Sequence, residues 1–192
     1  QEPRGWADRL AARLAARDSE LQYANLAVRG RRTAEIRAEQ LDAALALAPD
    51  LASVVTGVND VVLQSVDLEA VMLDLEAMYA ALRSRGCTVI GCTFPLPSVG
   101  LARRLRPRLR LLNAAIRETA ARQAVLVVDF EPIVAAADLR LWSPDRIHLN
   151  PLGHERLAAA FEAALTGGDE AWKEPLPAVA PPSRARVIAS EA

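Results

Sequence analysis

Cysteine and histidine are scarce in this 192-residue sequence, which has two of each. Cys87 and Cys92 lie five residues apart in one expected strand, so they are separated by about 16 Å and face opposite sides of the sheet. A disulfide between them is excluded, because bridged Cα atoms lie within about 7 Å. This pattern favours a cytoplasmic location; secretion stays open, because Gln1 is not a start residue. Two histidines without clustered carboxylates make no metal site, and we expect no metal or cofactor.

Long hydrophobic runs and an excess of one charge are also missing. The sequence is 52% hydrophobic, yet no apolar run approaches the roughly 20 residues that a membrane span needs. With 23 basic and 24 acidic residues the net charge is −1, so nothing indicates a general electrostatic affinity for nucleic acid or acidic membranes. The length and composition fit one domain with a hydrophobic core, with or without a tail.

Short apolar segments alternate with amphipathic ones along most of the chain. We expect strands at residues 21–28, 51–58, 88–94 and 124–130. We expect helices from Trp6 onward and at residues 34–48, 67–86, 106–123 and 153–165, with Thr33 as an N-cap and Gly86 as a C-terminal signal. Buried strands that alternate with amphipathic helices predict an α/β fold, a parallel sheet covered on both faces in a three-layer α/β/α sandwich.

The last part of the sequence differs in character from the rest. After about Gly167 it carries four prolines and no periodic apolar face. We therefore expect one α/β domain at residues 1–166 and a flexible, Pro-rich tail at residues 167–192.

Polar residues follow three of the expected strands. "RGRR" follows residues 21–28, "TGVND" ends the strand at 51–58, and "SPDRIH" lies beyond the last strand. In a parallel sheet, ligands bind at the carboxyl ends of the strands, so we expect a site there. In the last of these segments Asp145 and His148 lie three residues apart, which suits a proton-transfer pair.

These three segments, in this order, resemble the sequence blocks of one family. "TGVND" at 56–60 matches a Gly-x-Asn-Asp block, "NLAVRG" at 25–30 resembles a block with an oxyanion-hole glycine, and "DRIH" at 145–148 matches an Asp-x-x-His block. From about residue 5 to 166 the chain is similar to the SGNH hydrolases, the GDSL-type esterases and lipases. The resemblance implies a flavodoxin-like sheet and hydrolysis of a small-molecule carboxylic ester through an acyl-enzyme.

The resemblance also implies roles for individual residues. His148 would act as general base and acid, and Asp145 would hold its tautomer and stabilise the imidazolium. The Gly30 N–H and the Asn59 side-chain amide would hold the oxyanion of the intermediate. Gly57 would help shape the turn that aims Asn59.

Asp60 is expected to share that turn-shaping role, whereas His154 reads as a structural residue at a helix start. Three arginines, at positions 29, 31 and 32, surround Gly30 before an expected helix, where cations are mildly unfavourable. They form either a solvated basic turn or a contact with an anionic part of the substrate.

The family's Gly-Asp-Ser block, which carries the nucleophile, is missing. None of the eight serines follows Gly-Asp, and Ser143 lies on the acid–base loop itself. We expect that the sequence starts about 15 to 30 residues late and that a segment upstream of residue 1 supplies the serine and a first, central strand. The chain as given would then lack its nucleophile and show no serine-dependent turnover.

Two other kinds of function stay open. A catalytically silent SGNH-fold protein would bind acylated or glycan ligands. A generic flavodoxin-like nucleotide or signalling domain should carry a Gly-rich phosphate loop or an acidic phosphoacceptor cluster, and the sequence has neither. The acyl length of the substrate and the oligomeric state are not encoded in a readable motif.

Overall fold

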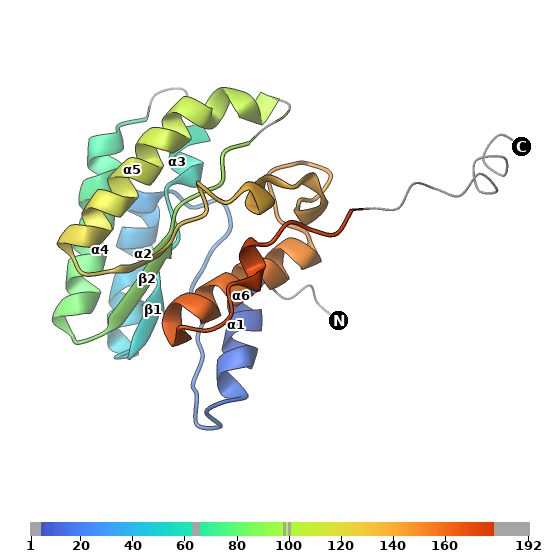
Figure 1. Ribbon diagram of the computed structural model, residues 1–192. Helices are drawn as coiled ribbons and strands as arrows, with labels where there is room; N and C mark the ends of the chain where they lie inside the picture. Colours follow the sequence, from blue (N-terminus) through green and yellow to red (C-terminus); the bar gives the residue numbers. More distant parts are fainter. Residues whose placement is uncertain (1–4, 63–65, 98, 100, 179–192) are drawn as a thin grey trace, which may run out of the picture.

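The computed structural model describes residues 5–62, 66–97, 99 and 101–178, in which short strands alternate with helices (Figure 1). The strands are β1 (Leu51–Ser53), β2 (Thr88–Cys92) and β3 (Leu126–Val128). The α-helices are α1 (Trp6–Ala15), α2 (Thr33–Ala46), α3 (Val58–Val62), α4 (Leu68–Ser84), α5 (Arg106–Arg122) and α6 (Pro151–Thr166). The 3-10 helices are η1 (Leu101–Leu105), η2 (Val134–Ala137), η3 (Leu139–Leu141) and η4 (Ala171–Lys173).

The three strands form a parallel sheet in the order β1-β2-β3. Ala52 pairs with Val89, and Gly91 pairs with Val127, so β2 lies between the other two strands. Parallel strands need long crossover connections, which the helices between them supply. The predicted α/β fold with a parallel sheet is confirmed.

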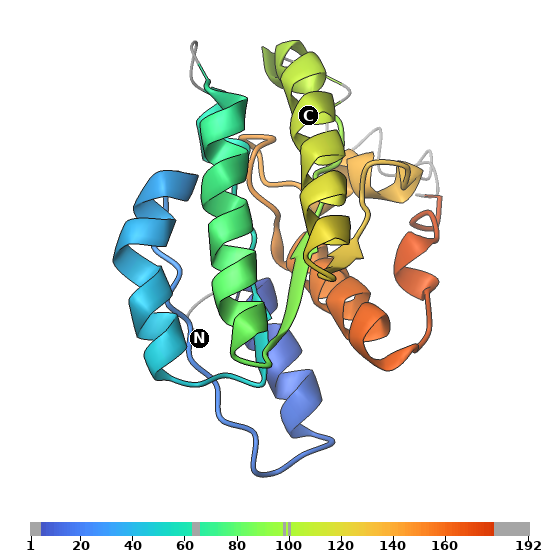
Figure 2. The same ribbon diagram turned by 90° about the vertical axis from the view of Figure 1, so that its left-hand side faces the viewer.

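Helices cover both faces of the sheet and create two hydrophobic clusters. Val89 of β2 belongs to the cluster beneath α2, α4 and α5, the three helices that face the viewer in Figure 2. Ile90 and Cys92 belong to the cluster beneath α1 and α6 on the other face. Cys87 lies in the first cluster, so the two cysteines are free, buried and on opposite sides of the sheet, as predicted.

The segment at residues 21–28 is not a strand, and that prediction is wrong. It runs between α1 and α2 without a ladder partner among the described residues, and Tyr23 and Val28 are exposed. Its sequence pattern favours an extended backbone, but a strand also needs a hydrogen-bonded neighbour. The strands expected at 51–58, 88–94 and 124–130 all form, with shorter bounds.

Helix α2 begins one residue earlier than the sequence predicts. Arg32 is its N-cap, and Thr33 is its first helical residue, so Thr33 is not the cap. The backbone N–H of Arg32 donates to Glu35 Oε2 at 2.9 Å. The hydroxyl of Thr33 serves a buried contact described below. The end of α4 is as predicted, with Gly86 at a φ of 82° just after the helix.

Part of the expected tail contacts the domain. The ring of Trp172, in η4, lies edge-on to Phe130 with centroids 5.3 Å apart. Arg156 Nη1 donates to Trp172 O at 3.2 Å, and Arg140 Nη2 donates to Leu176 O at 3.2 Å. These residues therefore pack on the fold, whereas the rest of the expected tail, residues 179–192, lies outside the described residues. The domain boundary stays a prediction.

Candidate active site

Asp145 and His148 form a hydrogen-bonded pair on the loop between η3 and α6. His148 Nδ1 lies 2.7 Å from Asp145 Oδ2, and both side chains are about half exposed. If the Nδ1 proton is donated to the carboxylate, the lone pair of the neutral ring lies on Nε2. The pair thus has the arrangement of a general base and the carboxylate that orients it.

The loop that carries the pair is closed by hydrogen bonds at its base. Trp142 and Leu149 form an antiparallel bridge, and Ser143 N donates to His148 O at 2.8 Å. Between them Arg146 adopts a φ of 58°, a left-handed conformation that makes the tight turn. The loop ends where Asn150 caps α6, its Oδ1 accepting from two backbone N–H groups, each at 3.0 Å.

The loop also holds Asp145 in its ionised form. Its carboxylate accepts the backbone N–H of His148 at 3.0 Å and that of Ile147 at 2.9 Å. These two bonds, followed by the bond to the His148 ring, hold the pKa of Asp145 well below its usual range. Asp145 is therefore negatively charged wherever His148 can act as a base.

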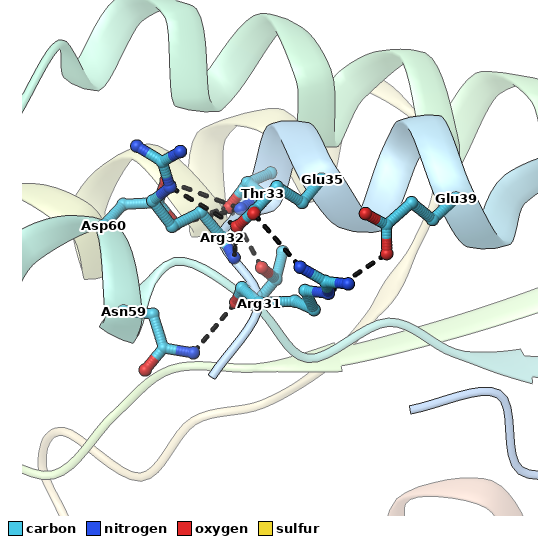
Figure 3. Close-up of polar contacts among 8 residues, drawn as sticks. Arg31, Arg32, Thr33, Glu35, Glu39, Asn59 and Asp60 are labelled. Carbon is cyan, nitrogen blue, oxygen red and sulfur yellow. Dashed lines mark hydrogen bonds and ion pairs between the residues drawn. The ribbon is translucent and has the colours of Figure 1, made fainter. Parts of the chain in front are cut away.

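Asn59 lies in the first turn of α3 (Figure 3). Gly30 lies in the segment just before α2. Asn59 Nδ2 donates to Arg31 O at 2.8 Å. An Asn amide has two N–H groups, so one donor of Asn59 is left for another acceptor. Gly30 has a φ of 82°, and no atom lies within 4 Å of the place that a Cβ would take. No atom beyond its chain neighbours therefore crowds the backbone of Gly30 on that side.

A buried polar network joins α2 to α3. Asp60 accepts the backbone N–H of Thr33 at 3.1 Å and its hydroxyl at 2.8 Å. The Thr33 hydroxyl also lies 2.9 Å from Thr56 Oγ1. Before Asn59, Gly57 has a φ of 104°, and a Cβ there would lie 2.8 Å from Leu112 Cδ1. The roles of Gly57 and Asp60 in holding Asn59 stay a prediction.

Residues 29–31 connect the two halves of the predicted site. Arg29 Nη2 lies 3.1 Å from His148 Nε2, and Arg31 O accepts from Asn59. Gly30 lies between these two contacts. Although no bond joins Asn59 to His148 directly among the described residues, both side chains meet the same three-residue segment. The structure therefore brings the three resembling segments together around residues 29–31.

The three arginines at positions 29, 31 and 32 differ in their partners. Arg31 pairs with Glu35 at 3.3 Å and with Glu39 at 3.0 Å, and Arg32 pairs with Glu35 at 3.3 Å (Figure 3). These two behave as a solvated basic turn that is neutralised by the first turns of α2. Arg29 instead meets His148, a contact that the sequence does not reveal.

No serine hydroxyl within the described residues is hydrogen-bonded to the ring of His148. Ser143 Oγ donates to Leu149 O at 3.3 Å, which serves the loop. Four of the eight serines, at positions 65, 98, 183 and 190, lie outside the described residues. His154 is half-buried in α6, and burial, followed by Arg9 and His148, lowers its pKa.

The described residues contain neither a metal-binding cluster nor a membrane-spanning helix. Over the described ranges, no three His, Cys, Asp or Glu side chains are placed to hold a metal ion. None of the helices in that part of the chain has the length and apolar character needed to cross a membrane.

Comparison with known proteins gives one family and a set of similar folds. The sequence model of the GDSL-like Lipase/Acylhydrolase family matches residues 1–156. Among curated proteins no sequence matches. LAE5, an alpha/beta hydrolase enzyme from the metagenome of Lake Arreo, is 26% identical, with 83% of this chain and 80% of LAE5 covered and a TM-score of 0.72.

Two further solved structures share the fold. TesA is 22% identical over 85% of this chain and 88% of its own, with a TM-score of 0.72. Axe2, an acetylxylan esterase from Geobacillus stearothermophilus, is 22% identical over 85% of this chain and 81% of its own, also with a TM-score of 0.72.

Proposed function

The chain belongs to the GDSL-like Lipase/Acylhydrolase family, a family of ester hydrolases, and we propose that it hydrolyses carboxylic esters through an acyl-enzyme. The observation that carries the proposal is the Asp145–His148 pair, with Nδ1 and Oδ2 2.7 Å apart. LAE5 and Axe2, which share the fold, are described as a hydrolase and an acetylxylan esterase, respectively. The activity of Axe2 supports ester chemistry in general, and the substrate of this chain is left to experiment.

In the first half of the reaction, a serine hydroxyl attacks the ester carbonyl carbon. His148 Nε2 takes the serine proton as the Oγ–C bond forms, and Asp145 stabilises the imidazolium. The carbonyl oxygen becomes an oxyanion, which accepts hydrogen bonds from the Gly30 N–H and the free N–H of Asn59; loss of one such donor costs about 3 kcal/mol. The intermediate collapses when the C–O bond to the alcohol breaks and His148 returns the proton to the leaving oxygen.

In the second half, water replaces the serine as nucleophile. His148 Nε2 takes a proton from water as it attacks the acyl carbon, and the same donors hold the second oxyanion. The bond to the serine breaks, the serine regains its proton from His148, and the carboxylic acid leaves. Neither half needs a cofactor.

We propose that the nucleophile is a serine from a segment upstream of residue 1. Two facts support this assignment: no serine in the sequence follows Gly-Asp, and no hydroxyl of a described serine is hydrogen-bonded to the His148 ring. Sequencing the complete gene tests it directly, since a Gly-Asp-Ser triplet ahead of residue 1 is expected.

Turnover of 4-nitrophenyl acetate and butyrate by the full-length protein tests the mechanism. The substitution His148→Ala should lower kcat by about a hundredfold to ten-thousandfold, the usual contribution of a general base. His154→Gln is the matched control, because His154 has no proposed role in the chemistry, and it should stay near the wild-type rate. Turnover indifferent to His148→Ala would contradict the proposal and favour a silent protein that binds acylated or glycan ligands.

A further inference from the structure

Arg29 places a permanent positive charge on the atom of His148 that the proposed mechanism uses. Its Nη2 lies 3.1 Å from His148 Nε2. A guanidinium has donors only, so Nε2 must be the acceptor in this contact. The lone pair that would take the serine proton is therefore already engaged. As long as the contact lasts, His148 cannot act as a base.

Arg29 also lacks the partners that its neighbours have. Arg31 and Arg32 are each paired with a glutamate of α2, whereas Arg29 has no carboxylate partner among the described residues. Its residue is exposed to solvent. The guanidinium is thus a charge beside the site that no acidic side chain in the described part of the chain neutralises.

We propose that the substrate is an ester with a carboxylate close to the scissile bond, and that this carboxylate draws Arg29 away from His148. The inference rests on the proposed ester hydrolysis. A guanidinium binds a carboxylate through two parallel, charge-assisted hydrogen bonds, which are stronger than its single bond to a neutral imidazole. A charged substrate therefore releases Nε2 as it binds, whereas a neutral ester offers the guanidinium no replacement partner.

Arg29 is then a specificity-determining residue. It recognises the substrate and, in the same movement, makes the base available. Arg29→Ala would remove both effects: Nε2 would be free for every ester, and the attraction for the carboxylate would be lost. The variant should consequently gain activity on neutral esters and lose activity on charged ones.

Two pairs of esters, each with a charged and a neutral member, test the proposed role of Arg29 in the full-length protein. One pair carries the carboxylate on the acyl side: 4-nitrophenyl hydrogen adipate and its methyl ester. The other carries it on the leaving group: 4-acetoxybenzoate and its methyl ester. In at least one pair, kcat/KM of the wild type should favour the charged ester by about tenfold, the worth of one charge-assisted hydrogen bond.

Substitutions at the neighbouring arginines provide matched controls. Arg29→Ala should abolish the preference for the charged ester and raise kcat on the neutral one. Arg29→Lys keeps the positive charge but cannot make the two parallel hydrogen bonds of a guanidinium, so it should keep part of the preference. Arg32→Ala should leave it unchanged. Equal rates within both pairs, or a preference that survives Arg29→Ala, would overturn the inference.

A binding measurement separates this inference from the proposed function. The chain has two histidines, so the ring nitrogens of His148 and His154 can be assigned by nuclear magnetic resonance with one substitution. Adding adipate to the full-length protein should shift Nε2 of His148 in the wild type and not in Arg29→Ala. If no ester is turned over, the shift still supports carboxylate recognition by Arg29, and its absence refutes it.

Discussion

Two aspartates of the site, Asp60 and Asp145, make similar bonds in different surroundings. Asp60 is 6% exposed and accepts the backbone N–H and the hydroxyl of Thr33. The side chain of Asp145 is 48% exposed and accepts two backbone N–H groups of its own loop as well as the His148 ring. The partners of Asp60 lie 27 residues away, whereas those of Asp145 lie two and three residues away.

The difference separates a structural carboxylate from a chemical one. Asp60 joins two helices in the protein interior, where an unpaired donor is costly. Its removal should therefore lower the free energy of unfolding. Asp145 shapes a surface loop and orients the proposed base, His148. Its removal should therefore lower kcat. Substituting each aspartate in turn tests whether stability and catalysis depend on different carboxylates.

The largest expected effect is that of Asp145→Asn on the reaction. An amide in place of the carboxylate cannot stabilise the imidazolium and can hold the wrong tautomer of His148, so kcat on 4-nitrophenyl butyrate should fall by about a hundredfold or more. The midpoint of urea unfolding should hardly move, because the side chain is exposed. A large shift of that midpoint would show that the comparison is mistaken.

Asp60→Ala should have its main effect on stability. It leaves the buried N–H and hydroxyl of Thr33 without their acceptor, so the free energy of unfolding should fall by about 2 to 4 kcal/mol. Urea denaturation followed by circular dichroism measures the change. Asp60→Asn, which keeps one acceptor oxygen, is the matched control and should lose less. An Asp60→Ala protein as stable as the wild type would show that the buried polar network between α2 and α3 does not stabilise the fold.

The smallest effect concerns acid pH. The pKa of Asp145 is lowered in the folded protein and lies near 3.9 in the unfolded chain. Its stabilising contribution is therefore present above about pH 4 and is lost as the pH falls below that value. The small difference between the unfolding midpoints of the wild type and Asp145→Asn should be constant from pH 7 to about pH 4 and should vanish as the pH falls further.

A titration of the carboxyl carbons by nuclear magnetic resonance gives the same information without unfolding. The resonance that disappears in Asp145→Asn should be the one that titrates well below the other exposed aspartates. An ordinary titration of that resonance would mean that the loop does not hold the carboxylate as described.

The fold could be predicted because its signals are local. Buried β-branched segments alternate with amphipathic helices, and this pattern alone requires a covered parallel sheet. The strand predicted at residues 21–28 failed because pairing is not local: an extended segment becomes a strand only beside another one. Asn150 before Pro151 is a strong local signal for a helix start, and its capping role could have been predicted.

The site could be predicted in part for the same reason. Asp145 and His148 are three residues apart, so their spacing already indicates a pair. The contact of Arg29 with His148 spans 119 residues, and no pattern around either residue reports it. Asp60 follows a glycine and an asparagine, a context typical of turns, but its carboxylate reaches across to α2.

The position of the two cysteines has a practical consequence. Burial raises the pKa of Cys92 to about 12 and, as the largest influence, also raises that of Cys87. Neither thiol is ionised near neutral pH, and both are shielded from reagents by the core. A cysteine introduced at Ile147, which is exposed beside His148, would thus be the one reactive thiol of this chain. A fluorophore attached there would report ligand arrival as a change in its emission.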